Sequence, residues 1–129
     1  MNLVTQAFWA ELRTSGPAIE MSQWSTLRRI GRSPCTMSEL ARHKGVGLPT
    51  ISKSVEMLVR RGWVERWIDK SDRRQTMVRL TSPGRRILAE CRRALEIFLD
   101  ERLAHLTSAE RNAVDESLQL VRRVLTVED

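Results

Sequence analysis

Apolar and polar positions in the first quarter of the chain follow the spacing of amphipathic helices. Apolar residues recur every three or four positions from about residue 2 to 14, and again from about 22 to 30. This spacing predicts two helices that each bury one face. Ser15-Gly16-Pro17 should end the first helix. Gly31 is predicted to follow the second helix in the left-handed conformation that commonly terminates helices.

Two further helices are predicted next, separated by a glycine turn. Thr36 and Glu39 have the spacing of a capping box, in which each side chain accepts a hydrogen bond from the other residue's amide. Residues 44–47 form the turn, where Gly45 supplies a left-handed conformation. The fourth helix begins near Leu48 and ends at Gly62. Its predicted buried face consists of Ile51, Val55, Leu58 and Val59.

The second half of the chain predicts a β-hairpin followed by two helices. Residues 63–68 and 75–80 are rich in β-branched and bulky side chains, whereas residues 69–74 are polar and charged. A long helix should span about 83–106, and a last helix about 107–125, opened by a capping box of Thr107 and Glu110. The fold class is therefore mainly α with a small β-hairpin, and 129 residues are expected to form a single domain.

Positive charge is concentrated in the middle of the chain. Residues 22–86 contain 15 lysines and arginines and 5 acidic residues, a net charge of +10. The rest of the chain contains 7 and 11, a net charge of −4. A basic centre with acidic flanks is typical of proteins that bind nucleic acid, although a well-solvated basic surface has the same composition.

The fourth helix has polar residues suited to base recognition. A helix, a short turn and a second helix place that second helix in the major groove of DNA, where base edges present distinct donors and acceptors. The candidate DNA-binding residues are Pro49, Thr50, Ser52 and Lys53, which lie in the first turns and include polar side chains away from the predicted buried face. An ordinary solvent-facing surface helix has similar residues, so this pattern alone leaves both interpretations open.

The tip of the predicted hairpin is basic. Lys70, Arg73 and Arg74 can contact the phosphate backbone, or a narrow minor groove whose negative potential favours arginine. Asp72 is two residues from Arg74 and can orient its guanidinium through a charge-assisted hydrogen bond. Asp72 can also make a local turn bond to the backbone, and the two roles are compatible.

In this order, the motifs resemble those of the MarR (multiple antibiotic resistance regulator) family of transcription factors over about residues 20–125. The resemblance is carried by Gln23-Trp24, by residues 38–41 and 49–52, and above all by the hairpin and its exit at residues 72–74 and 78–84. These last segments are similar to the family's D-x-R wing motif and its L-T-x-x-G helix entry. The sequence departs from the family pattern in two places. Gly47 stands where the family often has a serine N-cap, and the first helix is shorter than in many relatives.

The resemblance implies a sequence-specific, double-stranded-DNA-binding transcriptional regulator, commonly a repressor of a pseudo-palindromic operator. A winged helix-turn-helix would span about residues 20–86, and helices at about 1–19 and 87–129 would form a homodimer. It further implies that Arg74 enters the minor groove with Asp72 as its orienting partner. In this family, repression is commonly relieved by a small aromatic acid or by oxidation of a cysteine. The alternative function is a winged-helix protein–protein interaction module without operator binding.

Apolar residues in the terminal helices favour a dimer independently, because the last two helices carry more of them than one small domain needs. Packing within the chain is the competing explanation. The residues assigned to dimerisation are Leu3, Phe8, Leu99, Leu103, Leu118, Val121 and Leu125.

Two regulatory sites are hypotheses at this point. Trp9 and Trp24 can line a pocket for a small aromatic inducer, although buried tryptophans more often serve packing. Cys35 is predicted in a loop before the third helix, where an accessible thiol of lowered pKa would be redox-active. Cys91 lies on an apolar face and is expected in the core.

The sequence has no motif of an enzyme or a cofactor site. Its two cysteines and two histidines are scattered, so no metal site is expected. No apolar run approaches the roughly 18 residues that span a membrane, and the first residues do not have the pattern of a secretory signal. We therefore expect a cytoplasmic protein that is not an enzyme, has no cofactor and has no membrane partner.

Overall fold

The computed structural model describes residues 3–125, and these form six helices and three short strands. The helices are α1 (Leu3–Ser15), α2 (Met21–Arg32), α3 (Met37–Lys44), α4 (Leu48–Arg60), α5 (Ser82–Leu103) and α6 (Ser108–Leu125). The strands are β1 (Cys35–Thr36), β2 (Val64–Ile68) and β3 (Thr76–Leu80). The chain divides into two compact units, the first ending at Leu95 and the second beginning at Glu96, so that the boundary falls inside α5.

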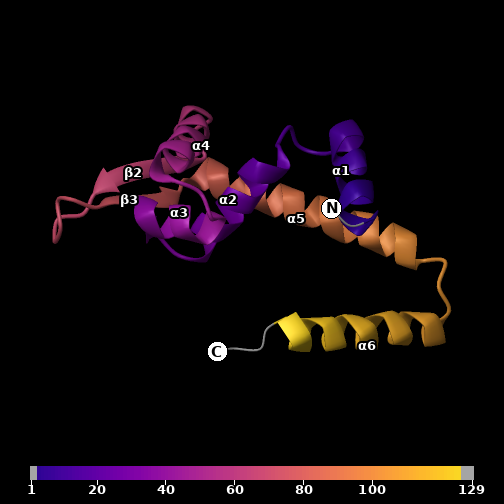
Figure 1. Ribbon diagram of the computed structural model, residues 1–129. Helices are drawn as coiled ribbons and strands as arrows, with labels where there is room; N and C mark the ends of the chain where they lie inside the picture. Colours follow the sequence, from indigo (N-terminus) through magenta and orange to yellow (C-terminus); the bar gives the residue numbers. More distant parts are fainter. Residues whose placement is uncertain (1–2, 126–129) are drawn as a thin grey trace. The chain divides into compact units, whose positions relative to one another are not determined.

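The sheet of the first unit has the strand order β1-β3-β2, and both pairings are antiparallel. Val64 pairs with Leu80 and Ile68 with Thr76, so β2 and β3 form the predicted hairpin. Its tip extends away from α3 and α4 (Figure 1). The sequence did not predict β1, because two residues are too few to display the alternation of a strand.

The core of the first unit is built where the helices meet the sheet. Leu27 and Ile30 of α2, Leu40 of α3, and Val64 and Val78 of the sheet are each at most 2% exposed. The predicted buried face of α4 is confirmed for Ile51, Val55 and Leu58, which are buried. Val59, the fourth predicted residue, is partly buried and packs against the same core cluster. Burial of each large aliphatic side chain contributes about 1.5–3 kcal/mol, which fixes α4 on the sheet.

The prediction for Gly31 is wrong, because α2 continues through it to Arg32. A Cβ at this position would lie 2.9 Å from Leu88 Cδ2 and 3.2 Å from Leu80 Cδ1. Gly31 is therefore required by close packing of α2, and not by a left-handed turn. Among the described residues, the positive φ angles belong to Gly45 and Gly62, at 66° and 74°.

The second unit contains the end of α5 and all of α6. The predicted capping box begins α6: the Thr107 amide donates to Glu110 Oε2 at 2.8 Å, and the Glu110 amide donates to Thr107 Oγ1 at 3.2 Å. α5 ends at Leu103, earlier than the predicted residue 106. No residue of α6 is buried within the chain.

Candidate nucleic-acid interface

α3, the first helix of the α3–turn–α4 pair, is capped at both of its ends. The Glu39 amide donates to Thr36 Oγ1 at 3.0 Å and the Thr36 amide to Glu39 Oε2 at 2.8 Å, which confirms the predicted capping box. These hydrogen bonds from Thr36 hold the pKa of Glu39 below its usual value. Gly45 caps α3 in the left-handed conformation. α4 then begins after Gly47, whose position lacks a side-chain cap.

The polar side of α4 faces solvent. Pro49, Thr50, Ser52 and Lys53 are all exposed, whereas Ile51 between them is 1% exposed. This is the arrangement that a recognition helix needs, because apolar anchors fix the helix while its first two turns remain free for contacts. The same helix carries an exposed ion pair between Arg60 and Glu56, with Nη2 and Oε1 2.9 Å apart.

Two long side chains that the sequence analysis did not single out hold the helix-turn-helix in place. Lys44 at the end of α3 donates from Nζ to Ser25 Oγ of α2 at 2.7 Å, and burial lowers the pKa of this lysine. Arg61, just after α4, donates from Nη1 to the Ala18 carbonyl at 2.6 Å and lies over the Trp63 ring. Neither contact has a local sequence signal, because each joins residues 19 or more positions apart.

The hairpin tip is ordered by local hydrogen bonds. The Ser71 amide and hydroxyl both donate to Asp69 Oδ1, at 2.9 and 2.8 Å, and the amide bond is the main reason that the pKa of Asp69 is lowered. The Asp69 amide donates to the Gln75 carbonyl, and the Gln75 amide to the Asp72 carbonyl, both at 3.0 Å. The tip therefore has a defined shape before any partner binds.

Asp72 contacts Arg74 in both of the ways that the sequence allowed. Its Oδ1 accepts a hydrogen bond from the Arg74 amide at 3.1 Å and another from Arg74 Nε at 3.2 Å. The Arg74 side chain is nevertheless 92% exposed. Lys70 and Arg73 are also exposed. Three cations therefore project from the tip, and one of them is oriented by a carboxylate.

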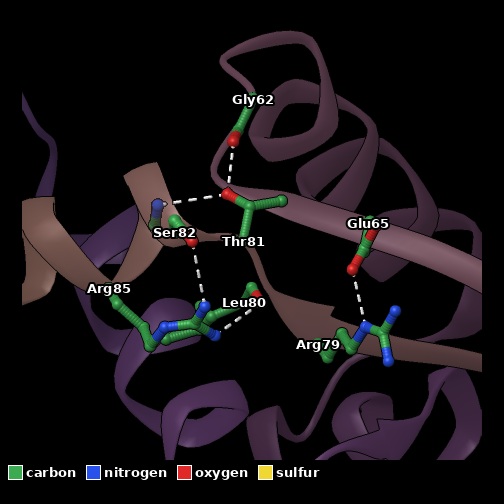
Figure 2. A network of polar contacts seen from close by, with 8 residues as sticks. Gly62, Glu65, Arg79, Leu80, Thr81, Ser82 and Arg85 are labelled. Carbon is green, nitrogen blue, oxygen red and sulfur yellow. Dashed lines mark hydrogen bonds and ion pairs between the residues drawn. The ribbon is translucent and has the colours of Figure 1, made fainter.

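A polar network joins the root of the hairpin to α4 and α5 (Figure 2). Thr81 donates its hydroxyl to the Gly62 carbonyl, and its amide donates to the Trp63 carbonyl at 3.0 Å. The Gly84 amide donates to the same hydroxyl, and a Cβ on Gly84 would lie 1.9 Å from the Trp63 carbonyl oxygen. Thr81 and Gly84 thus fix the hairpin against the end of α4, which explains their place in the L-T-x-x-G segment.

A groove of about 540 Å³ lies on the first unit beside this root. Trp24, Leu80 and Leu88 are among its apolar lining residues. Its cationic lining residues are Arg28, Arg32, Arg85 and Arg92. Arg85 also donates to the Leu80 carbonyl at 3.2 Å and to Ser82 Oγ at 3.1 Å, so it belongs to both the groove and the root of the hairpin.

Comparison with known proteins identifies the family. A family model described as MarR family matches residues 19–75. The multiple antibiotic resistance protein MarR of Escherichia coli is 31% identical over 108 residues, which are 83% of this chain and 74% of that protein. The chain belongs to the MarR family. It is accordingly a winged helix-turn-helix transcriptional regulator, as the resemblance predicted.

Solved structures of MarR-family proteins have the same fold. Wild-type MarR from E. coli, in its apo form, superposes with a TM-score of 0.75 at 28% identity, covering 92% of this chain and 90% of that one. Streptococcus pneumoniae FabT, solved in complex with DNA, gives a TM-score of 0.72 at 24% identity, with 95% and 92% coverage. At that identity the second similarity establishes the fold alone.

The MarR-type first unit also contains the two tryptophans expected to line a pocket. They pack against each other at 5.8 Å between ring centroids, with Phe8 at 5.6 Å from Trp9 and 6.1 Å from Trp24. Trp24 lines the 540 Å³ groove, whereas Trp9 lines a separate hollow. Trp9 is 8% exposed, and its indole N–H has no acceptor within the described residues.

The prediction that Cys35 lies in a loop is wrong. It pairs with Val78 as part of β1 and is 1% exposed, and burial raises the pKa of its thiol. Both properties oppose redox reactivity, which requires access and a lowered pKa. Cys91 is fully buried as expected, and burial raises its pKa to about 11.

The residues assigned to dimerisation lie in different environments. Phe8 is 4% exposed in the single chain, so little of its surface remains for contact with a second chain. Leu99 is 36% exposed, Leu118 is 62% exposed and Leu103 is half-buried. Val121 and Leu125 are exposed, and the Leu3 side chain lies outside the described part.

Across residues 3–125, no three His, Cys, Asp or Glu side chains gather in a way that could hold a metal ion. Over the same residues, no helix is both long enough and apolar enough to cross a membrane.

Proposed function

We propose that this chain binds double-stranded DNA sequence-specifically and represses transcription as a homodimer. The observation that carries the proposal is the pairing of Arg74 with Asp72 at an exposed, ordered wing tip on the same compact unit as α4. A carboxylate on a DNA-facing surface opposes binding unless it orients a cation, and this one accepts two hydrogen bonds from Arg74.

In this proposal, α4 enters the major groove and the wing follows the minor groove. Thr50, Ser52 and Lys53 provide hydrogen-bond donors and acceptors for base edges, and Pro49 lies at the start of the helix that approaches the DNA. Arg74 enters the minor groove, and Lys70 and Arg73 contact phosphates. FabT, which shares the fold, was solved in complex with DNA, and this supports the partner class.

The test is a mobility shift with the DNA upstream of the protein's own gene, in the presence of non-specific competitor. Arg74→Ala should weaken the specific complex by about 1–3 kcal/mol, the range for a good groove contact. Arg93→Ala removes the same charge from an exposed position on α5 and serves as the control. The affinity of the wild-type protein should also fall steeply between about 50 and 200 mM salt through counterion release.

A lack of any specific complex with upstream or pooled genomic DNA would contradict this function. The fold would then be better explained as a protein–protein interaction module. Equal losses from Arg74→Ala and Arg93→Ala, in variants that both remain dimeric, would instead show that the wing contributes only non-specific charge.

The homodimer in this proposal is formed by the terminal helices, at about residues 1–19 and 87–129, around a winged helix-turn-helix at about 20–86. Its support is the apolar surface of α6, which includes Val114, Leu118, Val121 and Leu125 at intervals of three and four residues. Side chains of this kind, with no buried residue on their helix, are typical of a surface covered by a second chain.

A small anionic aromatic molecule is the inducer that the groove would accommodate. Trp24 provides an aromatic wall, over which the Arg28 guanidinium lies 4.7 Å from the ring centre, and the four arginines of the groove attract a carboxylate. Because Arg85 donates to the Leu80 carbonyl at the end of β3, a ligand that draws its guanidinium away would loosen the root of the wing. Benzoate should therefore quench tryptophan fluorescence and weaken DNA binding, and neutral benzamide should not.

The variant that tests the route from the groove to the wing is Arg85→Ala, with the adjacent exposed Arg86→Ala as its control. The first should abolish the effect of benzoate on DNA affinity, and the second should preserve it. No benzoate effect on the wild-type protein would argue against an aromatic acid, without bearing on DNA binding itself.

A further inference from the structure

Three side chains on one face of the wing form a cluster that DNA contact does not explain. Glu65 pairs directly with Arg79 across the hairpin, and Trp67 is two residues further along β2 on the same face. Arg79 Nε lies 2.6 Å from Glu65 Oε1, and its guanidinium carbon lies 4.9 Å from the centre of the Trp67 ring. One guanidinium thus bridges two positions of the neighbouring strand. Glu65, Trp67 and Arg79 are called the wing brace below.

The brace lies outside the hydrophobic core. The side chains of Arg79 and Glu65 are 55% and 50% exposed, whereas Val64 and Val78, on the other face of the hairpin, are at most 2% exposed. An exposed ion pair and an exposed cation–π contact each contribute little to global stability. A role for the brace must therefore be local, in the part of the hairpin that the core does not reach.

That part of the hairpin has few other contacts between its strands. Beyond the pair of Trp67 with Met77, the pairing continues only through Ile68 with Thr76, where the Ile68 side chain is 62% exposed. The tip itself is joined by the backbone bonds of Asp69 and Gln75. An isolated two-stranded hairpin is marginally stable in water, so cross-strand side-chain pairs determine how well it is ordered.

We propose that the wing brace positions Arg74 for DNA binding by holding the outer hairpin in one geometry. The proposal rests on the DNA-binding function proposed above. Asp72 orients the Arg74 guanidinium within the tip, and the brace orients the tip relative to the rest of the first unit. The brace also pairs Arg79 with Glu65, so that this arginine does not compete with Arg74 for phosphates. Glu65, Trp67 and Arg79 are thus positioning residues that need not touch DNA.

A double-mutant cycle between Trp67 and Arg74 tests this role. Trp67→Leu keeps an apolar residue but removes the ring face, and it should raise the Kd for the upstream DNA about three- to tenfold, as one or two weak surface contacts allow. In an Arg74→Ala background the same change should alter the Kd less than about twofold, because residues that act through each other are not additive. Trp67→Phe retains a ring face and should restore most of the affinity.

The matched control is Ile68→Val, a conservative change at the next position of β2, on the opposite face of the hairpin. It should leave the Kd unchanged. Equal losses from Trp67→Leu with and without Arg74 would overturn the proposal, because Trp67 would then act independently of the wing tip. Equal affinities of the Phe and Leu variants, or no loss in either, would also overturn it.

Hydrogen exchange without DNA separates this proposal from the proposed function. The amides of Asp69 and Gln75 close the tip and should exchange several-fold faster in Trp67→Leu than in the wild-type protein. If the wild-type protein forms no specific DNA complex, the proposed function fails, and exchange still decides whether the brace orders the wing. Unchanged exchange at both amides would overturn the brace, whatever the DNA result.

Discussion

α4 and α6 are both amphipathic helices, but only one of them buries its apolar face within the chain. In α4, Ile51, Val55 and Leu58 are at most 1% exposed, and the polar side of the helix remains free. In α6, Leu118 is 62% exposed and Val121 is 52% exposed, and no residue of the helix is buried. The sequence pattern of the two helices is of the same kind, so the difference lies in what the rest of the chain supplies.

The comparison separates two tasks in one small regulator. The first unit encloses its own core, so α4 is held rigidly while it presents polar groups on its other side. The second unit leaves an apolar face that a single chain does not cover, which is the surface that the proposed homodimer needs. In the proposed homodimer, a rigid helix-turn-helix on each subunit and the interface between the subunits would together set the spacing of two half-sites on DNA.

The largest effect is expected from placing charge on the exposed face of α6. Leu118→Glu with Val121→Glu should raise the dissociation constant of the homodimer at least about a thousandfold, roughly 4 kcal/mol, because symmetry puts four carboxylates into one apolar interface. Analytical ultracentrifugation measures the change. Asn112→Glu with Gln119→Glu adds the same charge to polar positions of the helix and should leave the dimer intact. Equal dissociation of both variants would contradict the proposed interface.

Truncation of a side chain on the buried face of α4 should instead reduce the folding stability of the single chain. Leu58→Ala removes a fully buried side chain and should lower the free energy of unfolding by about 2–5 kcal/mol, through lost burial and the cavity left behind. Urea denaturation at fixed protein concentration measures it, because unfolding of a dimer depends on concentration. Ser52→Ala, on the exposed side of α4, should leave stability within about 0.5 kcal/mol of the wild type. A small effect of Leu58→Ala would show that α4 is not anchored by the core.

The sequence predicted much of this contrast, because each helix has a local signal. The capping boxes at Thr36 and Thr107, the left-handed Gly45 and the apolar stripe of α4 were all identified, since each depends on residues a few positions apart. The position of Asp72 beside Arg74 was predicted for the same reason. The resemblance to the MarR family added the expected roles of these elements, a DNA-binding winged helix-turn-helix and terminal dimerisation helices, which no local pattern provides.

The errors arose where distant residues meet. Gly31 was assigned to a helix end because glycine often terminates helices, but Leu80 of β3 and Leu88 of α5 pack so closely against it that a side chain would not fit. Cys35 was placed in an accessible loop, but pairing with Val78 buries it. Arg61, Lys44 and the wing brace were missed because their partners are 12 or more residues away or depend on strand register, which the sequence does not specify.

A smaller effect is expected at the start of the helix-turn-helix. Thr36→Ala removes the hydroxyl that caps α3 and should lower the free energy of unfolding by about 1 kcal/mol in urea denaturation. The Glu39 half of the box depends on pH. Because the pKa of Glu39 is lowered in the folded protein, the stabilisation by its carboxylate is fully present above the usual pKa of a glutamate and is lost as the pH falls through the lowered pKa. Glu39→Gln should flatten this part of the acid profile, and an unchanged profile would contradict the assignment.

The smallest effect tests whether the start of α4 is optimised for stability. Gly47 occupies the N-cap with φ −74° and ψ 160°, an extended conformation that any residue adopts, and a Cβ there would lie 3.6 Å from Pro49 Cδ, an ordinary contact. Serine therefore fits and can accept a hydrogen bond from the first turn. Gly47→Ser should raise the free energy of unfolding by a few tenths of a kcal/mol. Because the N-cap adjoins Pro49 and Thr50 at the proposed DNA surface, a gain in stability with a loss of DNA affinity would show that glycine is needed there for close approach to DNA. A gain in both would show that Gly47 is simply a weaker cap.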